Sequence, residues 1–323
     1  NGLMLPGRQI FLVDTHVNYD PTARELAKIT IMAAEEMRRF GLLPRAVLLS
    51  HSNFGTSNSA SALKMREALA IIRERLAAHA APDRRDRVEL AAVDYEWPNM
   101  GLVQGFDHDL GFNPVRLKLF TDATNAQDQV SVPEQRTFSP LYAHFRSPLA
   151  DLLGVRLIVS RHPLERMDKE FDPNDFIFLG QTKDGFVWEN PRALPRVMAP
   201  GAAQVVDIEK MLNEGGWPEL DFTRTVLLDG EEAGTPLQGP PGEARIISYR
   251  NTEVVVEAVS SQGCYLVLND VWHSWWSAQV DGAPAPILQA NVMFRAVRLE
   301  PGRHQVRFSF DPFTGLWAQL WKR

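Results

Sequence analysis

The sequence contains a single cysteine, Cys264, among its 323 residues. One cysteine excludes an internal disulfide and any zinc or iron–sulfur site built from several cysteines. No run reaches the roughly 18 to 20 apolar residues that span a bilayer, and the chain does not open with a basic segment followed by an apolar run. As written, it is expected to be cytoplasmic.

An excess of charge of one sign is also missing, since the formal net charge is -6 and charged residues make up 23% of the chain. This balance predicts no nucleic-acid surface. The nicotinamide fingerprint Gly-x-Gly-x-x-Gly does not occur. What is abundant is apolar content, at 45%. Together with the length, it predicts a substantial core divided into two or three domains.

Residues 1–76 have the pattern of an α/β unit. Apolar runs and a 3.6-residue period predict a strand at 10–13, a helix at 21–40, a strand at 46–49, a loop at 50–57 and a second helix. Parallel strands joined in this way open their carboxyl ends on one sheet edge. The loop is rich in Ser, Thr and Gly, so its amides and hydroxyls could hold a phosphate. The alternative is a plain helix-capping loop.

Three segments in this part carry a family resemblance: FLVDTHVNYD at 11–20, PTARELAKITIMAAEEMRRFG at 21–41 and LLSHSNFGTSNSASALKMREA at 48–68. They resemble the phosphate acetyl/butyryl-transferase domain, in the variant appended to bacterial NADP-type malic enzymes. The resemblance covers about 75 residues, only part of that domain. It implies a site for acyl-CoA or phosphate, with acetyl-CoA as a ligand to be sensed. The residues that inherit this role are Ser50, Ser52, Gly55, Thr56 and Ser57.

The chain departs from the active transferases at His51 and Asn53, where they more often show Tyr and Thr. The malic-enzyme catalytic domain is missing as well. We therefore assign no catalytic residue and no metal, and the nearest enzyme class is the acyltransferases.

Residues 77–87 predict a join between two unrelated pieces. Small residues from Ala77 to Pro82 lead into the charged run Asp83-Arg84-Arg85-Asp86-Arg87. The alternating charges favour a solvated connection over a phosphate contact.

The second piece is predicted as an α+β region at 88–240, an antiparallel β-sandwich at 241–312 and the start of a terminal apolar helix at 313–323. Strands are expected at 88–93, 155–159, 176–179, 186–189, 244–249, 252–259, 264–268, 275–280, 292–299 and 304–310. Helices are expected over 115–122 and from Ser147-Pro148. Alternation of apolar and polar residues in the last strand indicates a sheet with one buried face. The fold class is thus mixed α/β and all-β.

Four segments carry a second resemblance: PLADLLGVRLIV, ENPRALPR, LVLNDVWHSWWSAQVDG and ANVMFRAVRLEPG. They resemble the extracytoplasmic C-terminal region of YfhO-type bacterial membrane proteins, which are related to lipid-linked-sugar glycosyltransferases. The membrane helices of that family are missing here, and both ends of the chain are expected to be cut. The two resemblances imply opposite compartments.

Two further groups could bind ligands. Trp272, Trp275 and Trp276 could form a platform that stacks on a sugar, although a β-sandwich core explains them as well. The triplet Asp107-His108-Asp109 could ligate a metal, but a polar loop is favoured because no second cluster supports it.

Three hypotheses follow. The first is a fusion without a complete active site, whose larger part is an accessory domain of a membrane protein linked to lipid-linked sugar transfer. The second is an acyl-CoA or phosphate-binding unit, regulatory or acyltransferase in type. The third is a carbohydrate-binding β-sandwich.

Overall fold

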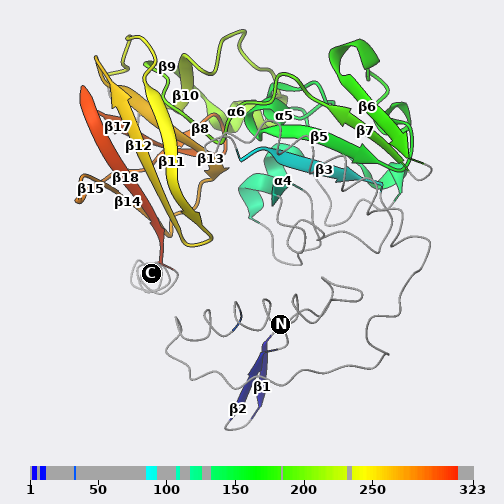
Figure 1. Ribbon diagram of the computed structural model, residues 1–323, viewed down its shortest axis with the longest axis horizontal. Helices are drawn as coiled ribbons and strands as arrows, with labels where there is room; N and C mark the ends of the chain where they lie inside the picture. Colours follow the sequence, from blue (N-terminus) through cyan, green and yellow to red (C-terminus); the bar gives the residue numbers. More distant parts are fainter. Residues whose placement is uncertain are drawn as a thin grey trace.

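The computed structural model describes residues 2–5, 8–11, 33, 85–92, 107–109, 117–125, 132–182, 185–230 and 235–311. Within these ranges the chain is mostly strands with few helices, arranged in mixed and antiparallel sheets (Figure 1). Near the N-terminus, β1 (Gly2–Leu5) and β2 (Arg8–Phe11) form an antiparallel hairpin. Ala33 is helical, inside the helix predicted at 21–40. The rest of residues 12–84, including the loop at 50–57, lies outside the described residues, as does the predicted terminal helix.

One sheet has the strand order β4-β3-β5-β7-β6. Its strands are β3 (Arg87–Ala91), β4 (Asp107–His108), β5 (Val155–Ser160), β6 (Ile177–Thr182) and β7 (Gly185–Glu189). β3 pairs in parallel with β4 and β5, whereas β7 is antiparallel to β5 and β6. A short helix, α5 (Pro148–Leu152), leads into β5, as the Ser-Pro signal predicts.

A second sheet has the order β8-β13-β17-β16-β10-β9. Its strands are β8 (Val197–Met198), β9 (Ala202–Val206), β10 (Thr225–Asp229), β13 (Cys264–Val271), β16 (Leu288–Ala290) and β17 (Phe294–Leu299). β9 and β10 are parallel and are joined through α6 (Ile208–Glu214), where Asp207 accepts a hydrogen bond from the Lys210 amide as N-cap. This sheet includes strands from both sides of the boundary predicted at residue 240, which stays a prediction.

The third sheet is antiparallel, with the order β11-β12-β18-β14-β15. Its strands are β11 (Glu243–Arg250), β12 (Glu253–Ser260), β14 (Trp276–Val280), β15 (Ala283–Ala285) and β18 (Gly302–Phe310). In β18, Val306 and Phe308 are fully buried while Arg307 is exposed, so the predicted alternation is confirmed. The turn after β14 places Asp281 and Gly282 at φ of 51° and 85°, as a two-residue hairpin turn requires.

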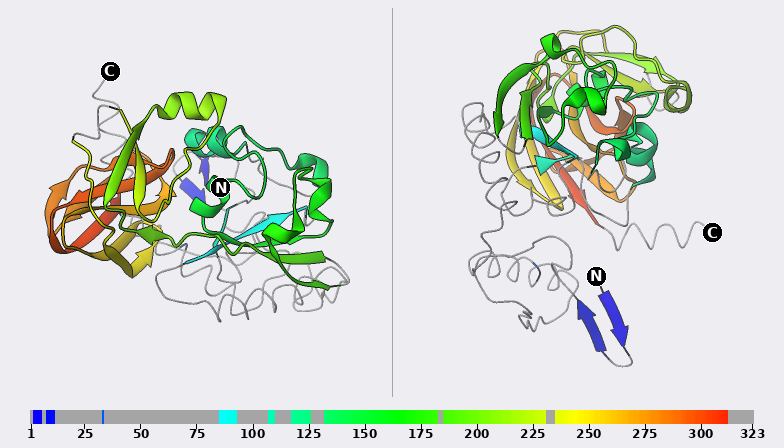
Figure 2. Two further views of the ribbon diagram at one scale, coloured as in Figure 1. Left: turned by 90° about the horizontal axis from the view of Figure 1, so that it is seen from above. Right: turned by 90° about the vertical axis from the view of Figure 1, so that its right-hand side faces the viewer.

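The described residues form three apolar clusters, one of which lies within the second sheet, and the other two join different elements. One joins β12, β14 and β18 to β13 and β17, through side chains that include Val256, Leu266, Val297 and Phe308. The other packs α5 and the loops before it against β5 and α6. Figures 1 and 2 show the third sheet at one end, the β3–β7 sheet at the other, and the second sheet with α6 between them.

The remaining helices are short. They are α4 (Lys118–Thr124), close to the helix predicted over 115–122, and 3-10 turns at Pro133–Gln135, Leu164–Arg166 and Pro173–Asp175. Across the described ranges, no helix is long and apolar enough to cross a membrane.

Candidate functional site

The residues predicted to hold acyl-CoA or phosphate, Ser50, Ser52, Gly55, Thr56 and Ser57, lie outside the described residues. Their arrangement therefore stays a prediction.

The three tryptophans proposed as a sugar platform are half-buried. Trp276 packs against the core between the second and third sheets, and the Arg295 guanidinium lies 3.8 Å from the centroid of its ring. Trp275 stands edge-on to His273, with ring centroids 5.0 Å apart, and lies 6.0 Å from the ring of Phe310. A cation already occupies one face of Trp276, whereas no cation among the described residues lies over the ring of Trp272 or of Trp275.

The triplet Asp107-His108-Asp109 divides between two charged clusters. Asp107 and His108 form β4. Asp107 pairs with Arg85 and Arg196. Burial and the charge of Glu89 raise the pKa of Asp109 well above its ordinary value. No group of three or more potential metal-binding side chains occurs among the residues with described positions.

A buried carboxylate, Asp270 in β13, accepts four donors. Its Oδ1 accepts from Arg87 Nη2 at 2.9 Å and from Arg196 Nη1 at 2.7 Å. Its Oδ2 accepts from the Tyr249 hydroxyl at 2.7 Å and lies 3.1 Å from Arg295 Nη2. Burial raises the pKa of this carboxyl, but the three guanidinium groups together hold it well below its ordinary value. Asp270 is therefore ionised in the folded protein.

Asp107 extends this network toward the surface. It accepts from Arg85 through both carboxylate oxygens, at 2.8 and 3.0 Å, and from Arg196 Nη2 at 2.8 Å. Arg85 also lies over the Tyr249 ring, 3.9 Å from its centroid. The junction cluster consists of Arg85, Arg87, Asp107, Arg196, Tyr249, Asp270 and Arg295. Because these residues come from or adjoin β3, β4, β8, β11, β13 and β17, the cluster connects all three large sheets.

The junction cluster corrects one sequence-based expectation. The charged run before residue 88 was predicted as a solvated connection, and this is wrong for Asp86 and Arg87. Asp86 is buried, and Arg87 begins β3 with its side chain 11% exposed. Arg87 donates to the Leu153 and Asn269 carbonyls as well as to Asp270. The charges of this run find partners on distant strands, which the local pattern does not reveal.

A second buried group, the Glu89 cluster, consists of Glu89, Asp109, Arg136 and Tyr142. Glu89 Oε1 accepts from Arg136 Nε at 2.7 Å, and its Oε2 accepts from the Tyr142 hydroxyl at 2.8 Å. The Arg136 guanidinium also lies over three aromatic rings, including that of Phe138 at 4.2 Å. Burial lowers the pKa of Arg136, but the negative charge of Glu89 outweighs it and holds that pKa above its ordinary value. From these two clusters the sequence singles out only Asp107 and Asp109 as possible metal ligands, and it does not predict their arginine partners.

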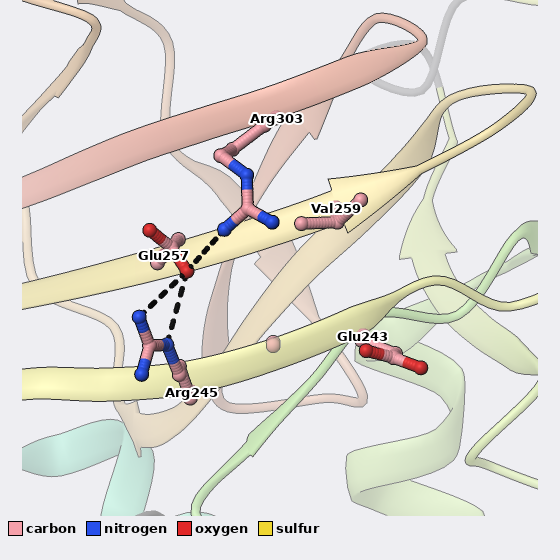
Figure 3. Close-up of a pocket in the computed structure, with 6 residues that line it drawn as sticks. Glu243, Arg245, Glu257, Val259 and Arg303 are labelled. Atoms are coloured by element: carbon pink, nitrogen blue, oxygen red, sulfur yellow. Dashed lines mark hydrogen bonds and ion pairs between the residues drawn. The ribbon is translucent and has the colours of Figure 1, made fainter.

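An open groove of about 560 Å³ lies on the outer face of the third sheet (Figure 3). Glu257 of β12 sits between Arg245 of β11 and Arg303 of β18, with oxygen–nitrogen distances of 3.0 and 2.6 Å. Both arginine side chains are mostly exposed. Solvent screening makes such a surface network energetically weak.

Comparison with known proteins bears on the first part of the chain. Residues 2–81 match the family described as phosphate acetyl/butaryl transferase. The chain is 63% identical over 75 residues to the NADP-dependent malic enzyme of Haemophilus influenzae. The matched segment covers 23% of this chain and 10% of that enzyme. It is 39% identical over 74 residues to the phosphate acetyltransferase of Escherichia coli, again 23% of this chain and 10% of the enzyme.

The first predicted resemblance is confirmed. The chain spans about a tenth of the length of these curated relatives. No solved structure matches it. The YfhO-type resemblance of residues 83–323 stays a prediction.

Proposed function

We propose that residues 2–81 form an acyl-CoA or phosphate-binding unit of the phosphate acetyltransferase type, attached to a β-rich domain. The observation that carries this proposal is the agreement between the family match over residues 2–81 and the 63% identity to a malic enzyme in the same part of the chain. The serine-rich loop at 50–57 supplies the chemistry, because backbone amides and hydroxyls ahead of a helix suit a phosphate or the pyrophosphate of CoA.

The direct test is calorimetric titration of the purified chain with acetyl-CoA. We expect saturable binding that weakens at least tenfold in the variant Ser52→Ala/Thr56→Ala/Ser57→Ala. Ser277→Ala is the matched control, since Ser277 is an exposed serine of β14 that only hydrogen-bonds the Ser309 carbonyl. Absence of binding by the unmodified chain, or equal affinity in the loop variant, would overturn the proposal.

Limited proteolysis gives an independent readout. If the unit folds around its ligand, acetyl-CoA should protect residues 1–76 from cleavage while residues 87–311 survive in both conditions. Digestion of residues 1–76 at the same rate with and without acetyl-CoA would mean that this part has no ligand-stabilised fold.

A second proposal concerns the β-rich domain: it is a carbohydrate-binding accessory domain of the YfhO type. The supporting observation is the aromatic group at one end of β14, where Trp275 keeps a half-buried ring without a cation above it. Aromatic faces suit the apolar faces of sugar rings. On a glycan array, Trp275→Ala should lose binding while Phe178→Ala, an exposed aromatic on β6, retains it. No glycan bound by the unmodified chain would refute this proposal.

A further inference from the structure

The junction cluster contains more positive than negative charge. Four arginines face two aspartates, and the remaining member, Tyr249, is neutral because burial raises its pKa to about 12. The like charges in the cluster affect the pKa of its arginines. Burial, followed by the positive charge of Arg196, lowers the pKa of Arg87 to about 10. Within the described residues, the cluster therefore has two cations in excess.

The central carboxylate, Asp270, cannot accept further hydrogen bonds from these arginines. An ionised carboxylate offers about four lone-pair positions. Arg87, Arg196, Tyr249 and Arg295 fill these positions on Asp270. Any further N–H group of these arginines needs another acceptor.

Three guanidinium nitrogens of the cluster have no acceptor among the described residues: Nε of Arg196, and Nε and Nη1 of Arg295. These are the two most deeply buried arginines of the cluster, with exposed fractions of 3% and 2%. Buried donors without partners are costly, and more so when they carry charge. Such groups in a native protein call for an acceptor such as a bound ion or water.

The Glu89 cluster is a useful contrast. Among the described residues, Nη2 of Arg136 is also a buried nitrogen without a partner. Its charge, however, is matched by Glu89 at 2.7 Å. Aromatic rings do not distinguish the two clusters, since Arg295 lies over Trp276 and Phe308 as Arg136 lies over its own three rings. A missing hydrogen bond alone can be met by water, whereas an excess of buried positive charge favours a bound anion.

An anion could reach the cluster from its outer side. The side chains of Arg85 and Asp107 are 35% and 30% exposed, whereas those of Arg196, Asp270 and Arg295 are 3%, 13% and 2% exposed. Arginine groups that converge on one point present the fork of N–H donors that suits a carboxylate or phosphate.

We propose that the junction cluster binds one small oxyanion, of the phosphate or carboxylate class, through Arg196 and Arg295. The anion neutralises part of the excess charge where the three sheets meet. This site is separate from the acyl-CoA unit and stands whether or not that unit binds its ligand.

The experiment is thermal unfolding in a zwitterionic buffer at constant ionic strength, with increasing inorganic phosphate. A bound anion raises Tm with the logarithm of its concentration once this exceeds Kd, by about 5 °C at roughly 100 times Kd. Exclusion of phosphate from the protein surface gives only a shallow rise that is proportional to the phosphate concentration. We expect the logarithmic component to disappear in Arg295→Met and to persist in Arg245→Met, an arginine of the exposed groove.

The loop variant Ser52→Ala/Thr56→Ala/Ser57→Ala separates this site from the proposed acyl-CoA site, and it should keep the logarithmic component. A logarithmic rise that is unchanged in Arg295→Met, or a rise in the unmodified chain that is only proportional to concentration, would overturn the inference. If Arg295→Met does not fold, equilibrium dialysis of radiolabelled phosphate against the loop variant decides the question. One anion per chain is expected, and no bound phosphate refutes the site.

Discussion

The junction cluster and the Glu89 cluster differ both in burial and in how their charges are balanced. In the Glu89 cluster the fully buried Arg136 pairs with the fully buried Glu89, and the pKa of the neighbouring Asp109 is raised. In the junction cluster three guanidinium groups converge on Asp270, while Arg85 and Asp107 are 35% and 30% exposed. The contribution of a charged group therefore depends on its partners as well as on its burial. The ratio of cations to carboxylates decides whether removing one member harms the fold.

The largest effect should come from removing the shared acceptor. Asp270→Asn keeps the shape of the side chain but leaves three buried guanidinium groups without a common negative charge. Removing one partner of a buried ion pair costs about 3–5 kcal/mol. We expect about 5 kcal/mol here, measured by urea unfolding, or no folded protein. A loss below about 1 kcal/mol would show that the three sheets do not depend on this carboxylate.

Arg136 of the Glu89 cluster and Arg295 of the junction cluster should respond differently to substitution by methionine. Arg136→Met leaves Glu89 buried without a cation, and we expect a loss of about 3 kcal/mol in the free energy of unfolding. Arg295→Met removes an excess cation and leaves Asp270 with two arginines, so we expect a change within about 1 kcal/mol in phosphate-free buffer. Equal losses in the two variants would break the comparison.

A smaller effect should appear in the pH dependence, through His108 between the two clusters. Burial lowers the pKa of His108 from 6.5 to about 4. Below pH 6.5, His108 is protonated in the unfolded chain but stays neutral in the folded chain. The free energy of unfolding therefore falls as the pH drops from about 6.5 to about 4. A shift of this size corresponds to about 2 kcal/mol after allowance for partial exposure.

The measurement is urea unfolding of the unmodified chain and of His108→Gln between pH 7 and pH 4.5. The difference between the two isolates His108 from the other titrating groups, including His162 and His273, whose pKa values burial also lowers. Parallel pH profiles would show that His108 takes up its proton in the folded state as readily as in the unfolded chain.

The sequence predicts β11, β12, β14 and β18 of the third sheet, most clearly β18, whose residues alternate between a buried and an exposed face, and it misses β15. It misses β9, β10 and α6, since strands of five residues beside glycine and proline carry little periodicity. The junction cluster is missed for another reason. Charged residues within strands are normally read as facing solvent, and Arg87 and Asp270 are 183 positions apart. The two residues meet only in the folded protein, where β3 of the first sheet and β13 of the second sheet come close together.

The first part of the chain shows the opposite case. There residues 2–81 match the phosphate acetyl/butaryl transferase family, yet the loop proposed to bind the ligand, at 50–57, lies outside the described residues. The resemblance proposes a site without its geometry, whereas the β-rich part has a described fold and matches no solved structure.

The smallest effect should come from the exposed groove, which tests whether burial matters at all. Glu257 lies between Arg245 and Arg303 on the outer face of the third sheet, and its hydrogen bonds with both arginines lower its pKa. Solvent and salt screen such pairs, so Glu257→Gln should leave the urea midpoint unchanged within error at 0.15 M salt, roughly physiological ionic strength. If this variant instead matched Asp270→Asn, surface and buried networks would contribute alike, and the contrast between the clusters would have no basis in solvation.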